Sequence, residues 1–150
     1  MNDWPPHITV ATVVQAQGRY LLVEERDKHT GKTVFNQPAG HLEPGESLAQ
    51  AALRETLEET AWRVKLQGIL GFALYTGAAN GATYYRTTFL ATPLEQDQNA
   101  ILDSDIIAAH WLDYESIRAN SARMRSPLVV AAIELERSGN SYPLDLIQHV

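Results

Sequence analysis

Three glutamates within five residues form the part of this sequence best suited to chemistry. Glu55, Glu58 and Glu59 lie in a stretch whose apolar periodicity predicts an α-helix. At about 100° of rotation per residue, the three side chains fall within about 100° of arc on one side of that helix. Carboxylates that close repel one another, so a positive group must lie among them, and a divalent metal ion is the obvious candidate.

The residues before these glutamates predict how the helix begins. A loop with two glycines and a proline, residues 40–46, leads to Ser47, which stands three residues before Gln50 in the pattern of a capping box. Small and apolar side chains between Ala49 and Thr60 form an arc that faces the core. Glutamates on a helix usually mark a solvated face. A merely structural helix, however, does not require one flank that packs on the core and another that presents acid.

The spacing of these residues resembles the Nudix box, the signature motif of the Nudix hydrolase family. The motif's glycine, glutamates and arginine match Gly40, Glu46, Arg54, Glu55, Glu58 and Glu59. Two positions depart from it, since Thr56 replaces a larger aliphatic residue and Ala61 replaces the last glycine. We expect Ala61 either to end the helix in the left-handed conformation, at a cost of about 1 kcal/mol, or to end it in another way.

The resemblance implies a role for each matched residue. Glu58 and Glu59 correspond to the metal-binding pair of the family, and Glu55 to a further ligand or to the base that deprotonates water. Gly40 corresponds to a position whose main-chain carbonyl often binds metal. Arg54, one turn before Glu58, is placed to orient that carboxylate, with Glu46 pinning the loop to the helix. The predicted catalytic set is Glu55, Glu58, Glu59 and Arg54, and the predicted metal ligands are Gly40, Glu55, Glu58 and Glu59.

The implied cofactor is Mg²⁺, with Mn²⁺ as a possible substitute. Mg²⁺ takes oxygen ligands in a near-octahedral shell and keeps several waters. Bound beside a diphosphate, it neutralises the phosphate oxygens and lowers the pKa of a bound water.

Three residues outside the motif are predicted to contact the substrate. Arg86 lies mid-strand and either clamps a phosphate or faces solvent. Arg125 precedes a helix start, where an anion is favoured. Asp103 and Asp105 lie in a turn-like loop from which Nudix enzymes often bring another acid, although turn chemistry explains both equally well. The predicted substrate-binding set is Arg86, Arg125 and Asp105.

The elements that position these residues indicate an α/β layered domain with a mixed sheet. Residues 7–14, 20–24, 34–36, 64–75, 83–94 and 106–113 are predicted strands. Helices are predicted from about Ser47, over residues 114–120, and from Ser126-Pro127 to about Arg137. The resemblance implies a Nudix-type α/β/α sandwich with the carboxylate helix on one face. Glu24 and Glu25 are expected at an exposed strand edge.

Composition sets the remaining bounds. A length of 150 residues fits one domain, so residues 1–150 are expected to form a single Nudix hydrolase domain. The net charge of −6 offers no basic patch for nucleic acid. No stretch approaches the roughly 20 apolar residues of a membrane span. We expect a cytoplasmic protein, monomeric or homodimeric, whose partner is a small di- or triphosphate.

Similar segments outside the motif resemble a bacterial phosphatase subgroup of the family. They are His7-Ile-Thr-Val-Ala11, Leu22-Val-Glu-Glu25, residues 36–43, Asp103-Ser-Asp-Ile106, Trp111 and Arg125-Ser-Pro-Leu-Val129. The resemblance implies release of orthophosphate from nucleoside di- and triphosphates and from thiamine-pathway diphosphates.

Three alternatives compete with this function. The first is a Nudix pyrophosphohydrolase of another specificity, acting on nucleoside diphosphate sugars or dinucleoside polyphosphates. The second is a non-catalytic Nudix-like sensor, which would require damaged metal residues, whereas every acid of the motif is present. The third is an isoprenoid diphosphate isomerase, which uses a cysteine, and this chain has none.

Overall fold

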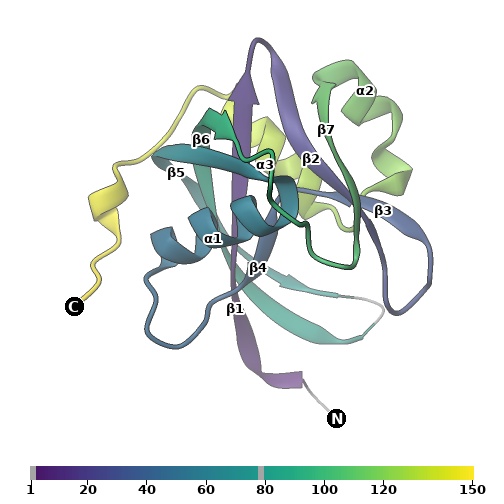
Figure 1. Ribbon diagram of the computed structural model, residues 1–150. Helices are drawn as coiled ribbons and strands as arrows, with labels where there is room; N and C mark the ends of the chain where they lie inside the picture. The colour runs from purple at the N-terminus through teal and green to yellow at the C-terminus, as the bar shows by residue number, and fades with distance from the viewer. Residues whose placement is uncertain (1–2, 78–79) are drawn as a thin grey trace.

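The computed structural model describes residues 3–77 and 80–150, which form a mixed α/β fold (Figure 1). Its strands are β1 (Asp3–Ala16), β2 (Arg19–Arg26), β3 (Thr33–Asn36), β4 (Ala39–His41), β5 (Trp62–Thr76), β6 (Ala82–Gln96) and β7 (Ile106–Asp113). Its helices are α1 (Leu48–Thr60), α2 (Tyr114–Ala119) and α3 (Leu128–Arg137). Single 3₁₀ turns cover Ser121–Arg123 and Leu144–Leu146.

The strands pair in both directions, as predicted for a mixed sheet. β1 runs parallel to β6 and antiparallel to β4, and β6 runs antiparallel to β5. β2 lies between β3 and β7 and is antiparallel to both. The turn between β1 and β2 joins the two groups of strands. α1 lies in front of the strands and α3 behind them in Figure 1, which confirms the predicted sandwich with the carboxylate helix on one face.

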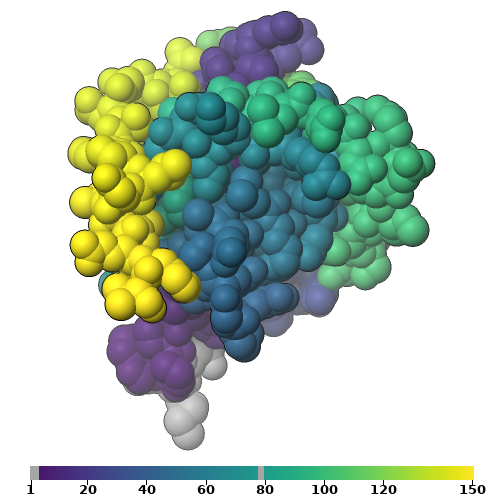
Figure 2. All heavy atoms as spheres, turned by 60° about the vertical axis from the view of Figure 1, so that its left-hand side comes forward, coloured from purple at the N-terminus to yellow at the C-terminus, as the bar shows by residue number. Residues whose placement is uncertain are grey.

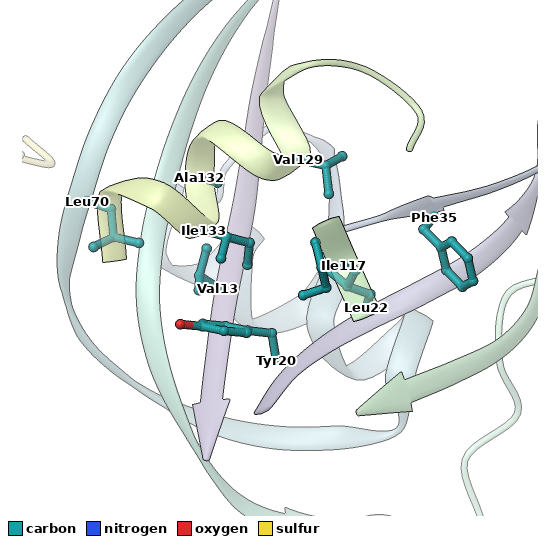
Figure 3. Close-up of a cluster of buried hydrophobic side chains, with 9 residues drawn as sticks. All are labelled: Val13, Tyr20, Leu22, Phe35, Leu70, Ile117, Val129, Ala132 and Ile133. Atoms are coloured by element: carbon teal, nitrogen blue, oxygen red, sulfur yellow. The ribbon is translucent and has the colours of Figure 1, made fainter. Parts of the chain in front are cut away.

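Each of these two helices covers its own part of the core. On the α3 side, Val129 and Ile133, spaced one helical turn apart, are fully buried against β-strand side chains such as Leu22 (Figure 3). On the α1 side, Ala51 and Ala52 pack against the apolar side chains of β1, β5 and β6. Small residues on α1 let the helix axis approach the sheet closely, which fixes the height of its acidic flank above the strands.

The helix ends agree with the sequence expectations. The Ser47 hydroxyl accepts from the Gln50 N–H at 3.1 Å and the Gln50 side chain accepts from the Ser47 N–H at 2.8 Å, which completes the capping box. Before α3, Pro127 already has helical dihedral angles, and the Ser126 hydroxyl accepts from the Leu128 N–H at 3.2 Å. Ala61 ends α1 in the left-handed conformation with φ 65° and ψ 12°.

One segment differs from the sequence expectations, and another lies where the sequence predicts nothing. Gly40 lies in a short strand, β4, and pairs with Val10, whereas a loop was expected there. Three residues are too few to show the period-two pattern that identifies a strand in a sequence. The C-terminal segment, which carried no prediction, runs beside α1 (Figure 2). Tyr142 exchanges two main-chain hydrogen bonds with Ile69, both at 2.8 Å, so this segment is fastened to β5.

Within the described residues, no helix has both the length and the apolar composition that a membrane crossing requires.

The left-handed residue at the end of α1 provides a test of backbone strain. Replacing Ala61 with glycine removes the clash of Cβ in this conformation, so Ala61→Gly should raise the free energy of unfolding by about 1 kcal/mol. Ala49→Gly, inside the same helix, should lower it by up to about 1 kcal/mol. Urea unfolding of both variants and the wild type measures the difference. A destabilised Ala61→Gly would contradict the strain.

Candidate metal centre and substrate cavity

Two glutamates of α1 meet an aspartate from a distant loop. Ligand oxygens of Glu55, Glu58 and Asp103 all lie within 4.8 Å of one another. The loop is fastened to the helix because the Asp103 N–H donates to the Glu58 main-chain oxygen at 3.1 Å. Glu55 is buried, Glu58 is half-buried and Asp103 is exposed, so the group opens to solvent on one side. Three hard oxygen ligands at this spacing suit a divalent cation.

Glu59 lies apart from that group, on the side of α1 that faces the sheet. It is only 8% exposed, and one of its oxygens accepts from the Ala39 N–H at 2.8 Å. Burial raises its pKa to about 9, with Glu25, Glu55 and Asp103 adding repulsion. Glu58 therefore lies with Glu55 and Asp103, whereas Glu59 is held against β4, close enough to Glu55 and Asp103 for their charges to act on it. A cation near Glu59 would favour its ionised form.

Gly40 lies so close to Glu55 that a side chain would not fit there. A Cβ built on Gly40 would stand 2.2 Å from Glu55 Cδ and 2.3 Å from Glu55 Oε1. Any other residue would displace the Glu55 carboxylate or the strand. Glycine at this position lets the main chain lie directly against the Glu55 carboxylate, and so next to the acidic group.

Arg54 connects the loop to the helix, as predicted. Its guanidinium contacts Glu46 at 2.7 Å and 3.0 Å, Glu55 at 2.7 Å and Glu58 at 3.5 Å, and it donates to the His41 carbonyl at 3.0 Å. The hydrogen bond with Glu46, followed by that with Glu55, raises the pKa of Arg54. The bond between Arg54 and Glu46 also lowers the pKa of Glu46. Burial raises the pKa of Glu55, and Arg54 opposes that rise. Arg54 thus holds two acids of the candidate site in place.

A cavity of about 620 Å³ lies beside the acidic side chains. It is lined by Gly40 and by the three residues predicted to bind substrate, namely Arg86, Arg125 and Asp105. The structure therefore brings all three to one space, next to the strand that contacts Glu55. A cavity of this volume suits a small organic phosphate.

The two arginines are held in different ways. Arg86 is 5% exposed and donates to Asn36 and Gln37, both at 3.4 Å. Burial lowers its pKa to about 10, so it stays protonated near neutral pH. Arg125 Nε donates to Glu25 at 2.6 Å. Both guanidinium groups line the cavity with donor capacity remaining, which suits phosphate oxygens.

Asp105 has a more exposed position than the arginines. Its carboxylate pairs with Lys28 at 3.0 Å on the cavity wall, and both side chains are largely accessible to solvent. The acid of this loop that joins the carboxylates is Asp103, two residues earlier. Both aspartates are named in the sequence analysis, and a turn pattern does not show that Asp103 reaches the carboxylates of α1 while Asp105 lines the cavity.

Glu25 is a residue that the sequence reasoning assigned wrongly. It was expected at an exposed strand edge, whereas it is 8% exposed and lines the cavity. β2 is paired on both sides, by β3 and β7, so its end remains covered. Three consecutive apolar residues, residues 21–23, are the signal that could have indicated this, since such runs occur in strands buried on both faces.

Comparisons with known proteins identify relatives of the whole chain. The NUDIX domain family matches residues 4–132. The phosphatase NudJ of Escherichia coli strain K12 is 41% identical over 143 residues, which cover 95% of this chain and 90% of that protein. A NUDIX hydrolase from Nitrosomonas europaea has 44% sequence identity and a TM-score of 0.93, covering 97% of each chain.

A more distant structure shows the same fold. The dihydroneopterin triphosphate pyrophosphohydrolase of E. coli is 21% identical with a TM-score of 0.66, covering 89% of this chain and 96% of that one. At this identity the likeness concerns the arrangement of strands and helices alone.

The burial of Glu59 predicts a pH dependence of the metal-free protein. Its folded-state pKa of about 9 lies above the ordinary value of 4.5, so the folded protein keeps a proton that the unfolded chain releases. In chelator, this contribution to stability is complete below about pH 4.5 and is lost as the pH rises towards 9. Glu59→Gln should be more stable than the wild type at pH 8, by on the order of 1 kcal/mol or more.

Urea unfolding in EDTA between pH 5 and pH 8 measures this difference. Glu115→Gln, which removes an exposed carboxylate from α2, is the matched control and should keep the pH dependence of the wild type. If the free energies of unfolding of Glu59→Gln and the wild type change with pH in parallel, Glu59 is ionised in the folded protein.

Proposed function

This chain belongs to the Nudix hydrolase family, and from that membership we propose that it is a Mg²⁺-dependent phosphohydrolase. Its proposed substrates are nucleoside di- and triphosphates and thiamine-pathway diphosphates, from which it releases orthophosphate. The observation that carries the proposal is the grouping of Glu55, Glu58 and Asp103 against Gly40, which lines a cavity together with Arg86 and Arg125. Acidic side chains that can bind a metal ion, with arginines nearby that can bind phosphate oxygens, suit a metal-bound phosphate chain.

The acidic residues supply the proposed metal site. Glu55, Glu58, Glu59 and the Gly40 carbonyl are the proposed ligands, with Asp103 as an additional one. When bound there, Mg²⁺ would neutralise phosphate oxygens and lower the pKa of a coordinated water. Glu55 acts as a ligand or as the base that takes the proton of the attacking water.

Other side chains position the reacting groups. Arg54 orients Glu55 and Glu58 through its ion pairs at 2.7 Å and 3.5 Å, and it supports catalysis in this way. Arg86 and Arg125 bind non-reacting phosphate oxygens through their planar guanidinium groups. Asp105 contributes to the wall of the same cavity. Water then attacks phosphorus on the side opposite the leaving oxygen.

The relatives support the substrate class. NudJ, 41% identical over nearly the whole chain, is described as a phosphatase. We extend that activity to this chain, as a single domain of residues 1–150 acting in the cytoplasm, as a monomer or homodimer and without nucleic acid as a partner.

A panel of nucleotides and thiamine diphosphate, each supplied with Mg²⁺, tests the proposal. Orthophosphate should appear from the diphosphates and triphosphates, EDTA should stop its release, and Mg²⁺ or Mn²⁺ should restore it. Separate assays for orthophosphate and pyrophosphate identify the product. Pyrophosphate as the main product of the triphosphates would favour the rival pyrophosphohydrolase, and full activity in EDTA would exclude the metal mechanism.

Substitution of Glu58 tests the proposed ligand. Glu58→Gln removes one negative oxygen from the metal site and should reduce kcat/KM by about a hundredfold or more, because metal stabilisation is worth several kcal/mol. Glu43→Gln is the matched control. Glu43 is an exposed residue of the loop before α1, lies outside the three-acid group and reaches Arg54 only at 3.6 Å. Normal turnover of a folded Glu58→Gln enzyme would refute the assignment.

A further inference from the structure

Side chains on the cavity side of the sheet form two rows set by strand register. In the first row, His7 of β1 is paired with Tyr84 of β6, and Tyr84 is paired with Tyr75 of β5. Paired residues on neighbouring strands point to the same face, so this row presents three aromatic rings.

The second row lies two residues further along each strand and carries the positive charge. Thr9 of β1 is paired with Arg86 of β6 and also with His41 of β4. A step of two residues spans about 7 Å along a strand, so the aromatic row and the arginine are neighbours on one floor. Tyr84, Tyr75, Arg86, Thr9 and His41 all line the cavity described above.

The register also places the acidic side chains relative to these rows. Ala39, whose N–H binds Glu59, is paired with Ala11, one step of two residues beyond Thr9. Along β1 the order is therefore His7 in the aromatic row, Thr9 next to Arg86, and Ala11 next to Ala39, which binds Glu59. Arg86 stands between the aromatic rings and the proposed metal site, so a phosphate bound there has an aromatic wall on its other side.

The aromatic side chains are held in position by polar contacts. Tyr84 and His7 have ring centroids 5.1 Å apart at an interplanar angle of 32°. The Tyr84 hydroxyl accepts from Asn80 at 3.1 Å, and a nitrogen of His7 lies 3.0 Å from one of His41. Tyr84 is only half-buried and lines the cavity, so its ring surface remains available there, with His7 packed against it.

We propose that this aromatic row is the subsite for a flat aromatic ring in the organic part of the substrate. The inference rests on the proposed function, because it assumes that phosphates occupy the space between Arg86 and the acidic residues. Ring stacking on tyrosine and histidine favours any planar heterocycle over a sugar or an alkyl group, since every such ring has a π-face. Tyr84, at the centre of the row, is the principal specificity-determining residue.

Binding of matched phosphonates tests the subsite without requiring turnover. Adenosine and cytidine 5′-(α,β-methylene)diphosphates carry a ring, and methylenediphosphonate carries the same P–C–P unit without a nucleoside. Calorimetric titrations with Mg²⁺ should show that the wild type binds both nucleoside analogues at least tenfold more tightly than methylenediphosphonate. Tyr84→Leu should reduce that preference about tenfold, because stacking on one aromatic side chain contributes this much or more.

Tyr85→Leu is the matched control, because the next residue on β6 points to the opposite face of the sheet and is 43% exposed. It should keep the full preference, while Tyr84→Phe, which retains the ring, should keep most of it. Tyr75→Leu is a second variant at the row, because Tyr75 also lines the cavity, and it should also reduce the preference. Circular dichroism confirms that each variant folds.

Two results would overturn the subsite. The first is a wild type that binds the nucleoside analogues no more tightly than methylenediphosphonate. The second is a folded Tyr84→Leu or Tyr75→Leu whose preference is unchanged. The proposed hydrolysis fails separately, if no phosphate is released from the nucleotide panel while the binding preference persists.

Discussion

The site depends on holding several carboxylates close together against their mutual repulsion. Glu55, Glu58 and Asp103 share one space, and Glu59 lies buried behind them. Arg54 is the fixed positive charge that offsets part of this repulsion, since it contacts acids on both the loop and the helix. One guanidinium does not balance so many carboxylates. Negative charge therefore remains among these acids, which is why this region suits a cation.

The scaffold that resists this repulsion lies on the other flank of α1. Ala51 and Ala52 are fully buried, and Thr56 donates to the Ala52 carbonyl while also contacting Thr12 of β1. Thr56 replaces the larger aliphatic residue of the motif, and its hydroxyl is satisfied in the core. A helix fastened this firmly can present like charges that an isolated helix could not. Packing on one flank therefore makes the chemistry of the other flank possible.

Features that depend on the helix itself could be predicted from the sequence. The grouping of Glu55 with Glu58 and the cap at Ser47 follow from positions along one helix, whereas the sequence leaves the conformation at Ala61 open. Contacts between distant segments could not. Asp103 reaches Glu58 from 45 positions away, and the burial of Glu25 depends on the two strands that flank β2. Strand pairing decides both, and residue spacing contains no information about strand order.

The anion-binding side has its own support, which links it to the second core. Gln37 is fully buried, donates to the Val129 carbonyl at 2.8 Å and accepts from Arg86 at 3.4 Å. Val129 in turn packs in the cluster beneath α3 (Figure 3). Arg86 is thus positioned by the α3 side of the fold, whereas the carboxylates are positioned by the α1 side. Changes in one core can alter phosphate binding without moving the acidic residues, so substrate preference can vary among proteins that keep the same motif.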